Sequence, residues 1–280
     1  IPFFSERPEF FRKLRVYDAV FAPSDWVREN FFVAGGLDPE KVMVTGFASL
    51  DILTREPVNK KQLHKDNNIL SDTITVLIAP TLVFTPGMKA AIIPFDLDPE
   101  EYFSRLNEWA ISRNAQVVIR PHHFTRLDAA TDLERVFFRP ANLYPDAQQL
   151  LGVTDVLVTD WSAIGVYYLA KSCPVIYLDV PPPASDGLAV LDGSDRAGYV
   201  AADFDSLLAG LDEAVINSSE HMARFREVRE RVVEKAFGST LDGLSGKRYY
   251  SNLLDLVGRK KSKEAGYLEL EIGVGKSIDE

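Results

Sequence analysis

Short apolar runs alternate along this chain with segments whose apolar residues recur at helical spacing. TITVLIAPT (73–81) is typical of a buried strand, whereas PEEYFSRLNEWAISR (99–113) has the spacing of an amphipathic helix. AQVVIRPHH (115–123) and DVLVTDWS (155–162) are again strand-like, and AIGVYYLAKS (163–172) is helix-like. Strands that alternate with helices in this way predict a parallel, doubly wound α/β sheet.

A smaller set of strand-like runs precedes this sheet. YDAVFAPS (17–24) and DPEKVMVTGF (38–47) each indicate a strand, and SDWVRENFFVAGG (24–36) indicates a helix that Ser24 caps. The polar segment 55–72 is typical of a linker or a surface helix. The chain is therefore predicted to contain the remainder of an N-terminal domain (1–65), a complete C-terminal domain (66–257) and a tail (258–280).

The composition is that of an ordinary soluble globular protein, with 46% apolar and 26% charged residues. The net charge of −10 disfavours a general affinity for nucleic acid. Cys173 is the single cysteine and lies in an apolar stretch, so we expect a buried thiol in a reducing compartment. The sequence shows neither a bilayer-spanning apolar run nor a basic leader segment, and we expect a cytoplasmic location.

Polar residues follow several of the predicted strands. In open α/β sheets, ligands bind outside the carboxyl ends of the strands. Thr159 and Asp160 end one strand, and Ser162 is placed to cap the helix that begins at Ala163. The free N–H groups of such a helix start can hold a phosphate. The alternative is a plain capped helix in which Asp160 is a structural carboxylate.

The sequence Arg120-Pro121-His122-His123 also follows a strand. A histidine there can transfer a proton or stabilise charge near neutral pH, although two solvated loop histidines are an equal alternative. Because successive residues on extended backbone point in opposite directions, only one of the pair should face a site. A metal site needs further ligands, and no matching Cys or Asp/Glu spacing accompanies the pair, so we expect no metal.

The two other histidines, His64 in the polar linker and His221 on an exposed helix, are expected to have no special role. Asp242, Gly243 and Ser245 form a loop that enters the last predicted helix, as a ligand site or as a simple turn and cap. The chain contains no GxGxxG after a strand, no GxxxxGK[ST] and no GxSxG. These absences disfavour Rossmann dehydrogenases, P-loop NTPases and α/β-hydrolases.

Several motifs in chain order resemble those of the CDP-glycerol:glycerophosphotransferase family, the teichoic-acid and capsule polymerases. They are YD…F.PS, VTG…LD, APT, a basic residue two positions before a His, YPDAQQLLGVTDVLVTDWSAIGVYYLAKSCPVIYLD, GYV…LL and DG.S..R. The resemblance covers about residues 17–256. It implies a GT-B-like fold with a complete C-terminal Rossmann-like donor domain and a truncated N-terminal half.

The resemblance also implies a metal-independent transferase without a cofactor. This enzyme would move glycerol phosphate, or a related polyol or sugar phosphate, from a CDP-activated donor to a lipid-linked or polymeric cell-envelope acceptor. His122 and Asp160 are its expected catalytic residues. The residues expected to bind the donor or its phosphates are Thr81, Arg120, His122, Thr159, Ser162, Ala163, Asp242, Gly243 and Ser245.

The sequence departs from the family pattern at several positions. Val83 replaces the arginine of a Pro-Thr-x-Arg motif, Ala48 and Ser49 replace a Pro-Arg pair, and Ala163 replaces a serine. The family's Trp-His-Gly motif, which carries the acceptor-side base, would lie upstream of Ile1.

Two other functions remain open on the sequence. One is a UDP-type GT-B glycosyltransferase or epimerase, and the other is a non-catalytic nucleotide-binding or scaffold domain. A lipid-linked acceptor would place the chain peripherally on the inner face of the plasma membrane. The basic run Arg259–Lys261 could assist there or could be a solvated tail.

Overall fold

The computed structural model describes residues 8–54, 59–81, 93–95, 97–121, 132–181 and 193–258. The chain divides into two compact units, one of Ile1–Asp51 with Lys235–Glu280 and one of Ile52–Glu234. Residues 235–258 therefore group with the described part of the N-terminal segment. The sequence predicted domain boundaries after residues 65 and 257. The structure instead divides the chain after Asp51 and after Glu234.

The unit Ile52–Glu234 contains a six-stranded sheet in the order β5-β4-β3-β6-β7-β8, and each neighbouring pair is parallel. The predicted parallel α/β sheet is therefore confirmed. The strand order grows outward in both directions from the central pair β3 and β6, which is the doubly wound arrangement. The strands are β3 (Ile74–Ile78), β4 (Ala115–Ile119), β5 (Val136–Phe138), β6 (Val156–Thr159), β7 (Val175–Leu178) and β8 (Tyr199–Ala201).

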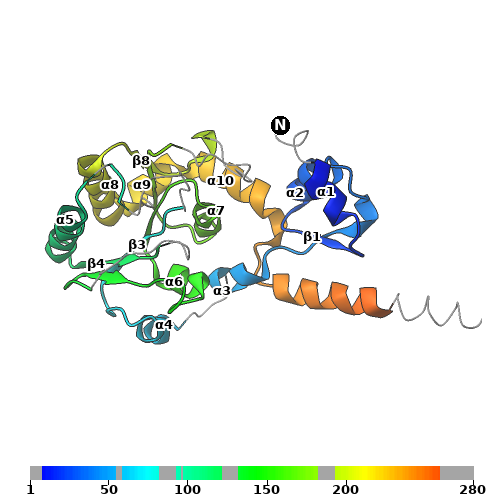
Figure 1. Cartoon of the computed structure of the whole chain (residues 1–280), viewed down its shortest axis with the longest axis horizontal. Helices are drawn as coiled ribbons and strands as arrows, with labels where there is room; N and C mark the ends of the chain where they lie inside the picture. Colours follow the sequence, from blue (N-terminus) through cyan, green and yellow to red (C-terminus); the bar gives the residue numbers. More distant parts are fainter. Residues whose placement is uncertain are drawn as a thin grey trace, which may run out of the picture. The chain divides into compact units, whose positions relative to one another are not determined.

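Helices connect these parallel strands. Figure 1 shows α5 beside α8, and three hydrogen bonds of 2.8 Å to the Asp212 carboxylate on α8, from Trp109 and Arg113 at the end of α5, join the two helices. Asp98 caps α5 by accepting from the N–H groups of Glu100 and Glu101. The helices are α4 (Lys60–Asp66), α5 (Pro99–Ser112), α6 (Ala147–Val153), α7 (Ala163–Leu169), α8 (Phe204–Ile216), α9 (Ser218–Arg224) and α10 (Arg226–Ala236).

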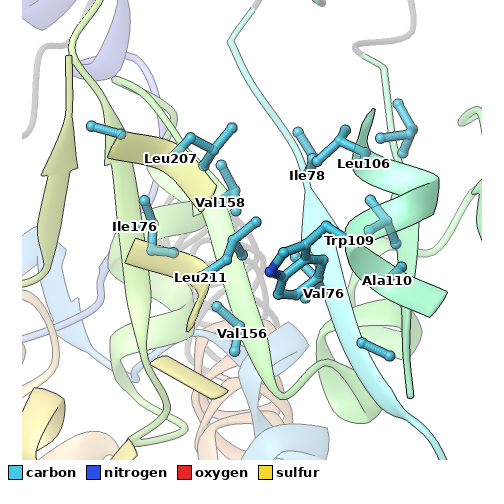
Figure 2. Close-up of a cluster of buried hydrophobic side chains, with 14 of the residues drawn as sticks. Val76, Ile78, Leu106, Trp109, Ala110, Val156, Val158, Ile176, Leu207 and Leu211 are labelled. Atoms are coloured by element: carbon cyan, nitrogen blue, oxygen red, sulfur yellow. The ribbon is translucent and has the colours of Figure 1, made fainter. Parts of the chain in front are cut away.

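The main core lies between the sheet and the helices α5 and α8. Figure 2 shows side chains from the strands and from both helices pointing toward one another. Alternate strand residues face this layer, such as Val76 and Ile78, because successive side chains of a strand point to opposite faces. Trp109 fills the space opposite them from α5 (Figure 2). This packing fixes the carboxyl ends of β3 and β6 relative to each other.

The other unit contains a two-stranded parallel sheet of β1 (Val20–Ala22) and β2 (Val42–Val44). Ser24 caps the following helix as predicted, with its Oγ accepting from Val27 N at 3.1 Å. That helix is a short α-helical turn, α2 (Asp25–Val27), that continues as the π-helix Arg28–Val33. The other elements of this unit are α1 (Pro8–Leu14), a helix over 245–258 and 3-10 turns at Pro39–Lys41, Ala48–Leu50 and Gly238–Thr240. The helix α3 (Asp51–Thr54) crosses the boundary between the units, and a further 3-10 turn, Gly193–Asp195, belongs to the unit Ile52–Glu234.

Three local predictions about single residues were wrong. His221 is 1% exposed on α9 and His64 is 8% exposed on α4, so neither is an exposed or linker residue. Both pack against their own unit because each occupies the inward face of its helix. Cys173 is half-buried rather than buried, since it lies in the short turn between α7 and β7. Among the described residues, no helix has the length and apolarity needed to cross a membrane.

Candidate functional site

The carboxyl ends of β3 and β6 form the centre of the candidate site. These strands are neighbours, with Ile78 in register with Val158. The chain continues from β3 toward β4 on one side and from β6 toward β7 on the other. A sheet of this kind binds ligands where the strand order reverses, outside the carboxyl ends. Thr81 follows β3 and Asp160 follows β6, so both lie at this point.

Asp160 joins the two loops through one carboxylate oxygen. Its Oδ1 accepts from Thr81 N at 2.7 Å, from Thr81 Oγ1 at 2.6 Å and from Ser162 N at 3.1 Å. The Asp160 residue is 3% exposed. Hydrogen bonds to an ionised carboxylate are roughly twice as strong as neutral ones. These contacts give Asp160 a positioning role, and its catalytic role stays a prediction.

Thr159 and Ser162 complete this corner of the sheet. The Thr159 hydroxyl is fully buried and donates to Ala79 O at 2.7 Å, which ties β6 to the end of β3. Ser162 is the N-cap of α7, as predicted, with its Oγ 3.5 Å from Ile164 N. Ala163 is exposed as the first helical residue, where backbone N–H groups have no partner within the helix. Gly165 lets the helix approach the strand, since an added Cβ would lie 3.2 Å from Thr159 Cγ2.

Arg120 directly follows β4, but its guanidinium already donates hydrogen bonds to two backbone carbonyls. Nη1 donates to Tyr144 O at 2.6 Å and Nη2 to Pro145 O at 3.2 Å. Burial lowers the pKa of Arg120, and the nearby Asp146 carboxylate partly offsets this effect. These bonds anchor the loop before α6, so a phosphate contact of Arg120 stays a prediction. His122 and Val83 lie outside the described residues.

Three other predicted site residues, Asp242, Gly243 and Ser245, belong to the unit that contains β1 and β2. The Asp242 carboxylate accepts two hydrogen bonds from Arg248, at 2.8 Å each, and one from Leu244 N at 3.0 Å. The Arg248 hydrogen bonds lower the pKa of Asp242 to about 2. Gly243 has a φ of +73°, which favours glycine. The loop is thus a closed turn held by an ion pair.

Asp51 is a buried contact of the Asp242–Ser245 loop, and the sequence analysis did not single it out. It is 7% exposed, and its carboxylate accepts from Ser245 N at 3.1 Å and from Gly246 N at 2.8 Å. It therefore caps the helix 245–258 from a position almost two hundred residues away. Asp51 is the last residue of the VTG…LD motif, so the sequence did indicate that this position matters. Gly46 of the same motif has a φ of +83°, and an added Cβ would lie 2.4 Å from Ser245 Oγ.

The structure thus brings the predicted residues together in two groups. Thr81, Thr159, Asp160 and Ser162 meet at one corner of the six-stranded sheet. Asp242, Gly243 and Ser245 meet in the other unit. Within the described residues, no group of three or more His, Cys, Asp or Glu side chains is placed to hold a metal ion.

Comparison with known proteins gives relatives that are named as teichoic acid polymerases. The chain is 29% identical over 168 residues to a teichoic acid poly(ribitol-phosphate) polymerase of Bacillus spizizenii, covering 58% of this chain and 26% of that protein. It is 25% identical over 243 residues to the teichoic acid ribitol-phosphate polymerase TarL of Staphylococcus aureus, covering 80% and 42%. The chain therefore spans less than half the length of these relatives.

The fold is shared with solved structures of the wall teichoic acid polymerase TagF. One of them superposes with a TM-score of 0.66 at 19% identity, covering 91% of this chain and 62% of TagF. A TagF variant soaked with CDPG superposes with a TM-score of 0.68 at 18% identity, covering 91% and 60%. This likeness agrees with the GT-B-like α/β class expected from the sequence. The family model described as CDP-Glycerol:Poly(glycerophosphate) glycerophosphotransferase matches residues 3–252, and the chain belongs to this family.

Proposed function

We propose that this chain carries the donor site of a transferase that builds a teichoic-acid type of polymer from a CDP-linked polyol phosphate. The family match over residues 3–252 is the observation that carries the proposal. Two relatives polymerise ribitol phosphate by name, and a TagF structure was soaked with CDPG. The donor is therefore CDP-glycerol or CDP-ribitol, and the acceptor is a polymer or lipid-linked chain that ends in a hydroxyl group.

The reaction is a phosphoryl transfer. The acceptor hydroxyl oxygen forms a bond to the phosphorus that carries the polyol, the pyrophosphate P–O bond breaks, CMP leaves, and a base takes the hydroxyl proton. Such a step depends on positioning and on neutralising charge around the phosphates. The corner formed by Thr81, Thr159 and Asp160 supports this role because it lies at the switch point of the sheet. His122, which follows β4 in the sequence, is proposed to stabilise the leaving phosphate without a metal.

A nucleotide screen tests the donor class. We expect CDP and CMP to raise the melting temperature more than UDP or GDP do, because a ligand at 100 times its Kd adds about 2.7 kcal/mol of stability. Incubation with CDP-glycerol or CDP-ribitol and a polyol-phosphate primer should then release CMP, with the rate unchanged by EDTA. Selectivity for UDP would instead indicate a glycosyltransferase or epimerase. The absence of any nucleotide response would favour a scaffold.

Peripheral membrane contact forms part of the same proposal. Tyr250, Leu253, Leu254 and Val257 are all exposed on the helix 245–258, at the spacing of one helical face. The basic run Arg259–Lys261 follows directly in the sequence. An apolar helical face beside basic residues matches a membrane that contains anionic lipid.

Vesicle sedimentation tests this contact. The chain should pellet with vesicles that contain phosphatidylglycerol and should remain in solution with pure phosphatidylcholine. The double variant Leu253→Asp, Leu254→Asp should lose pelleting while its circular dichroism spectrum is unchanged. Equal binding of the variant and the wild type would exclude this helix as the contact.

A further inference from the structure

Arg196 places a buried guanidinium beside the corner that contains Asp160. The residue lies between the 3-10 turn Gly193–Asp195 and β8, and its side chain is 7% exposed. Its Cζ lies 3.9 Å from the centroid of the Trp161 ring, and such a stacking of cation on aromatic ring is attractive. Trp161 is the residue between Asp160 and Ser162. Sequence reasoning assigned Arg196 no role.

Trp161 is itself held in place, so that it can orient the arginine. The indole Nε1 donates to Val180 O at 2.8 Å, just after β7. Asp179, at the same strand end, accepts from Arg196 Nη1 at 3.3 Å. The guanidinium is therefore fixed on one face by an aromatic ring and at one nitrogen by a carboxylate.

Two further donor nitrogens of Arg196 have no hydrogen-bond partner among the described residues. In the described part of the chain, Nε and Nη2 are buried and have no hydrogen-bond partner. These two N–H groups lie on the same edge of the planar guanidinium, the edge that binds carboxylate or phosphate with two parallel hydrogen bonds. A buried donor without a partner destabilises the folded state, so an unpartnered pair in a native structure requires an explanation.

Arg120 shows the opposite arrangement. It follows β4 and was the arginine that the sequence suggested for phosphate binding, yet Nη1 and Nη2 both donate to backbone carbonyls. Arg196 instead has its charge held in position while one full edge of the guanidinium has no partner among the described residues. Of these two arginines, Arg196 is the one with two N–H groups left to bind an oxyanion.

We propose that the Nε and Nη2 edge of Arg196 binds a phosphate of the nucleotide diphosphate donor through two parallel hydrogen bonds. This inference rests on the proposed function, because it concerns the donor of the same reaction. The ligand chemistry is an oxyanion with two adjacent oxygens. Trp161 and Asp179 are positioning residues that hold the guanidinium for it.

Isothermal titration of CDP against the full chain tests the proposal. Arg196→Lys and Arg196→Gln should each weaken CDP binding by roughly tenfold to a hundredfold, the value of hydrogen bonds to a charged group. Cytidine, which lacks phosphate, should bind all variants equally. Arg105→Lys is the matched control because Arg105 is a partly exposed arginine that pairs with Asp205. This control should bind CDP like the wild type.

The lysine variant separates phosphate binding from a structural role. Lysine keeps the positive charge over Trp161 but lacks the two-pronged edge. If Arg196 only supports the fold, Arg196→Lys would bind CDP like the wild type, and the proposal would be overturned. An equal loss of affinity for cytidine and CDP in the variants would overturn it as well.

A measurement on the wild type makes the test independent of variant folding. The Nε–H resonance of Arg196 in a 15N-arginine sample should shift on addition of CDP or inorganic pyrophosphate and should not shift with cytidine. An unchanged resonance with saturating CDP would contradict the proposal. Failure of the wild type to bind CDP at all would instead reject the proposed function, so the two failures are distinguishable.

Discussion

One carboxylate oxygen of Asp160 accepts hydrogen bonds from both the amide and the hydroxyl of Thr81, at 2.7 and 2.6 Å. The two residues are 79 positions apart and follow the two central strands of the six-stranded sheet. A buried carboxylate that joins both strand ends holds the switch point of the sheet in one geometry. Any phosphate bound there would meet loops whose positions Asp160 has already fixed.

Replacement of Asp160 should destabilise the unit that contains it. Asp160→Ala leaves two partly buried N–H groups and a hydroxyl without their acceptor, and we expect a loss of about 3 kcal/mol in the free energy of unfolding. Asp160→Asn keeps an acceptor oxygen and should lose about 1 kcal/mol. Urea denaturation measures both values. Asp205→Ala, which removes an exposed carboxylate paired with Arg105, is the control and should change little. Equal stability of the Asp160→Ala variant and the wild type would exclude the positioning role of Asp160.

His122 should be essential for turnover. From the family resemblance we expect His122 to contact the donor pyrophosphate, and removal of a positioned acid, base or charge-stabilising group lowers rates by about 10²-fold or more. CMP release from the CDP-linked donor by His122→Ala should therefore fall by this factor, with folding unchanged. His123→Ala is the matched control, because the adjacent side chain should face the other way. A near-normal rate for His122→Ala would remove this residue from the mechanism.

Gly46 should not tolerate a side chain. Its φ is +83°, and a Cβ there would lie 2.4 Å from Ser245 Oγ. We expect Gly46→Ala to cost about 2–3 kcal/mol through backbone strain and the displaced Ser245. Gly258→Ala in the last helix, where an added Cβ meets nothing within 4 Å, is the control. Thermal unfolding should show a clear loss for the first variant only, and matching melting curves would refute the steric argument.

His221 should make folding sensitive to mild acid. Burial lowers the pKa of His221 below 6.5, and this outweighs the Glu213 carboxylate, which raises the pKa, while Arg224 lowers it further. The neutral form is therefore favoured in the folded state, and the unfolded state takes up the proton first. Stability that is complete above pH 6.5 should fall as the pH drops from 6.5 toward the folded pKa.

Urea denaturation at pH 7.5, 6.5 and 5.5 measures the effect. His221→Gln should show a smaller fall in the free energy of unfolding between pH 6.5 and 5.5 than the wild type does. Parallel pH profiles for the two proteins would show that another group controls acid sensitivity. His221 Nδ1 lies 3.1 Å from the Glu213 carboxylate, which raises the pKa of His221. Glu213→Gln should therefore show a larger fall in the free energy of unfolding between pH 6.5 and 5.5 than the wild type does.

Much of the sheet and of the TDWSA corner could be predicted from the sequence, because both depend on local patterns. Apolar runs of strand length and the Ser162 cap are properties of a few neighbouring residues, and they indicated β3, β4, β6 and the start of α7 correctly. The role of Arg120 was harder to judge, since its position after a strand indicates a site while its partners, Tyr144 and Pro145, are more than twenty positions away.

The sequence by itself determined that the chain forms a parallel α/β sheet with polar residues at its strand ends, because periodicity and caps act locally. Only the tertiary structure decided which of those residues meet. It joined Thr81 to Asp160, used Asp51 to cap the helix 245–258 and stacked Arg196 on Trp161, with Nε and Nη2 of Arg196 unpartnered among the described residues. These pairings connect residues 35 to almost two hundred positions apart in the chain, and packing of the core, which no local pattern encodes, sets them.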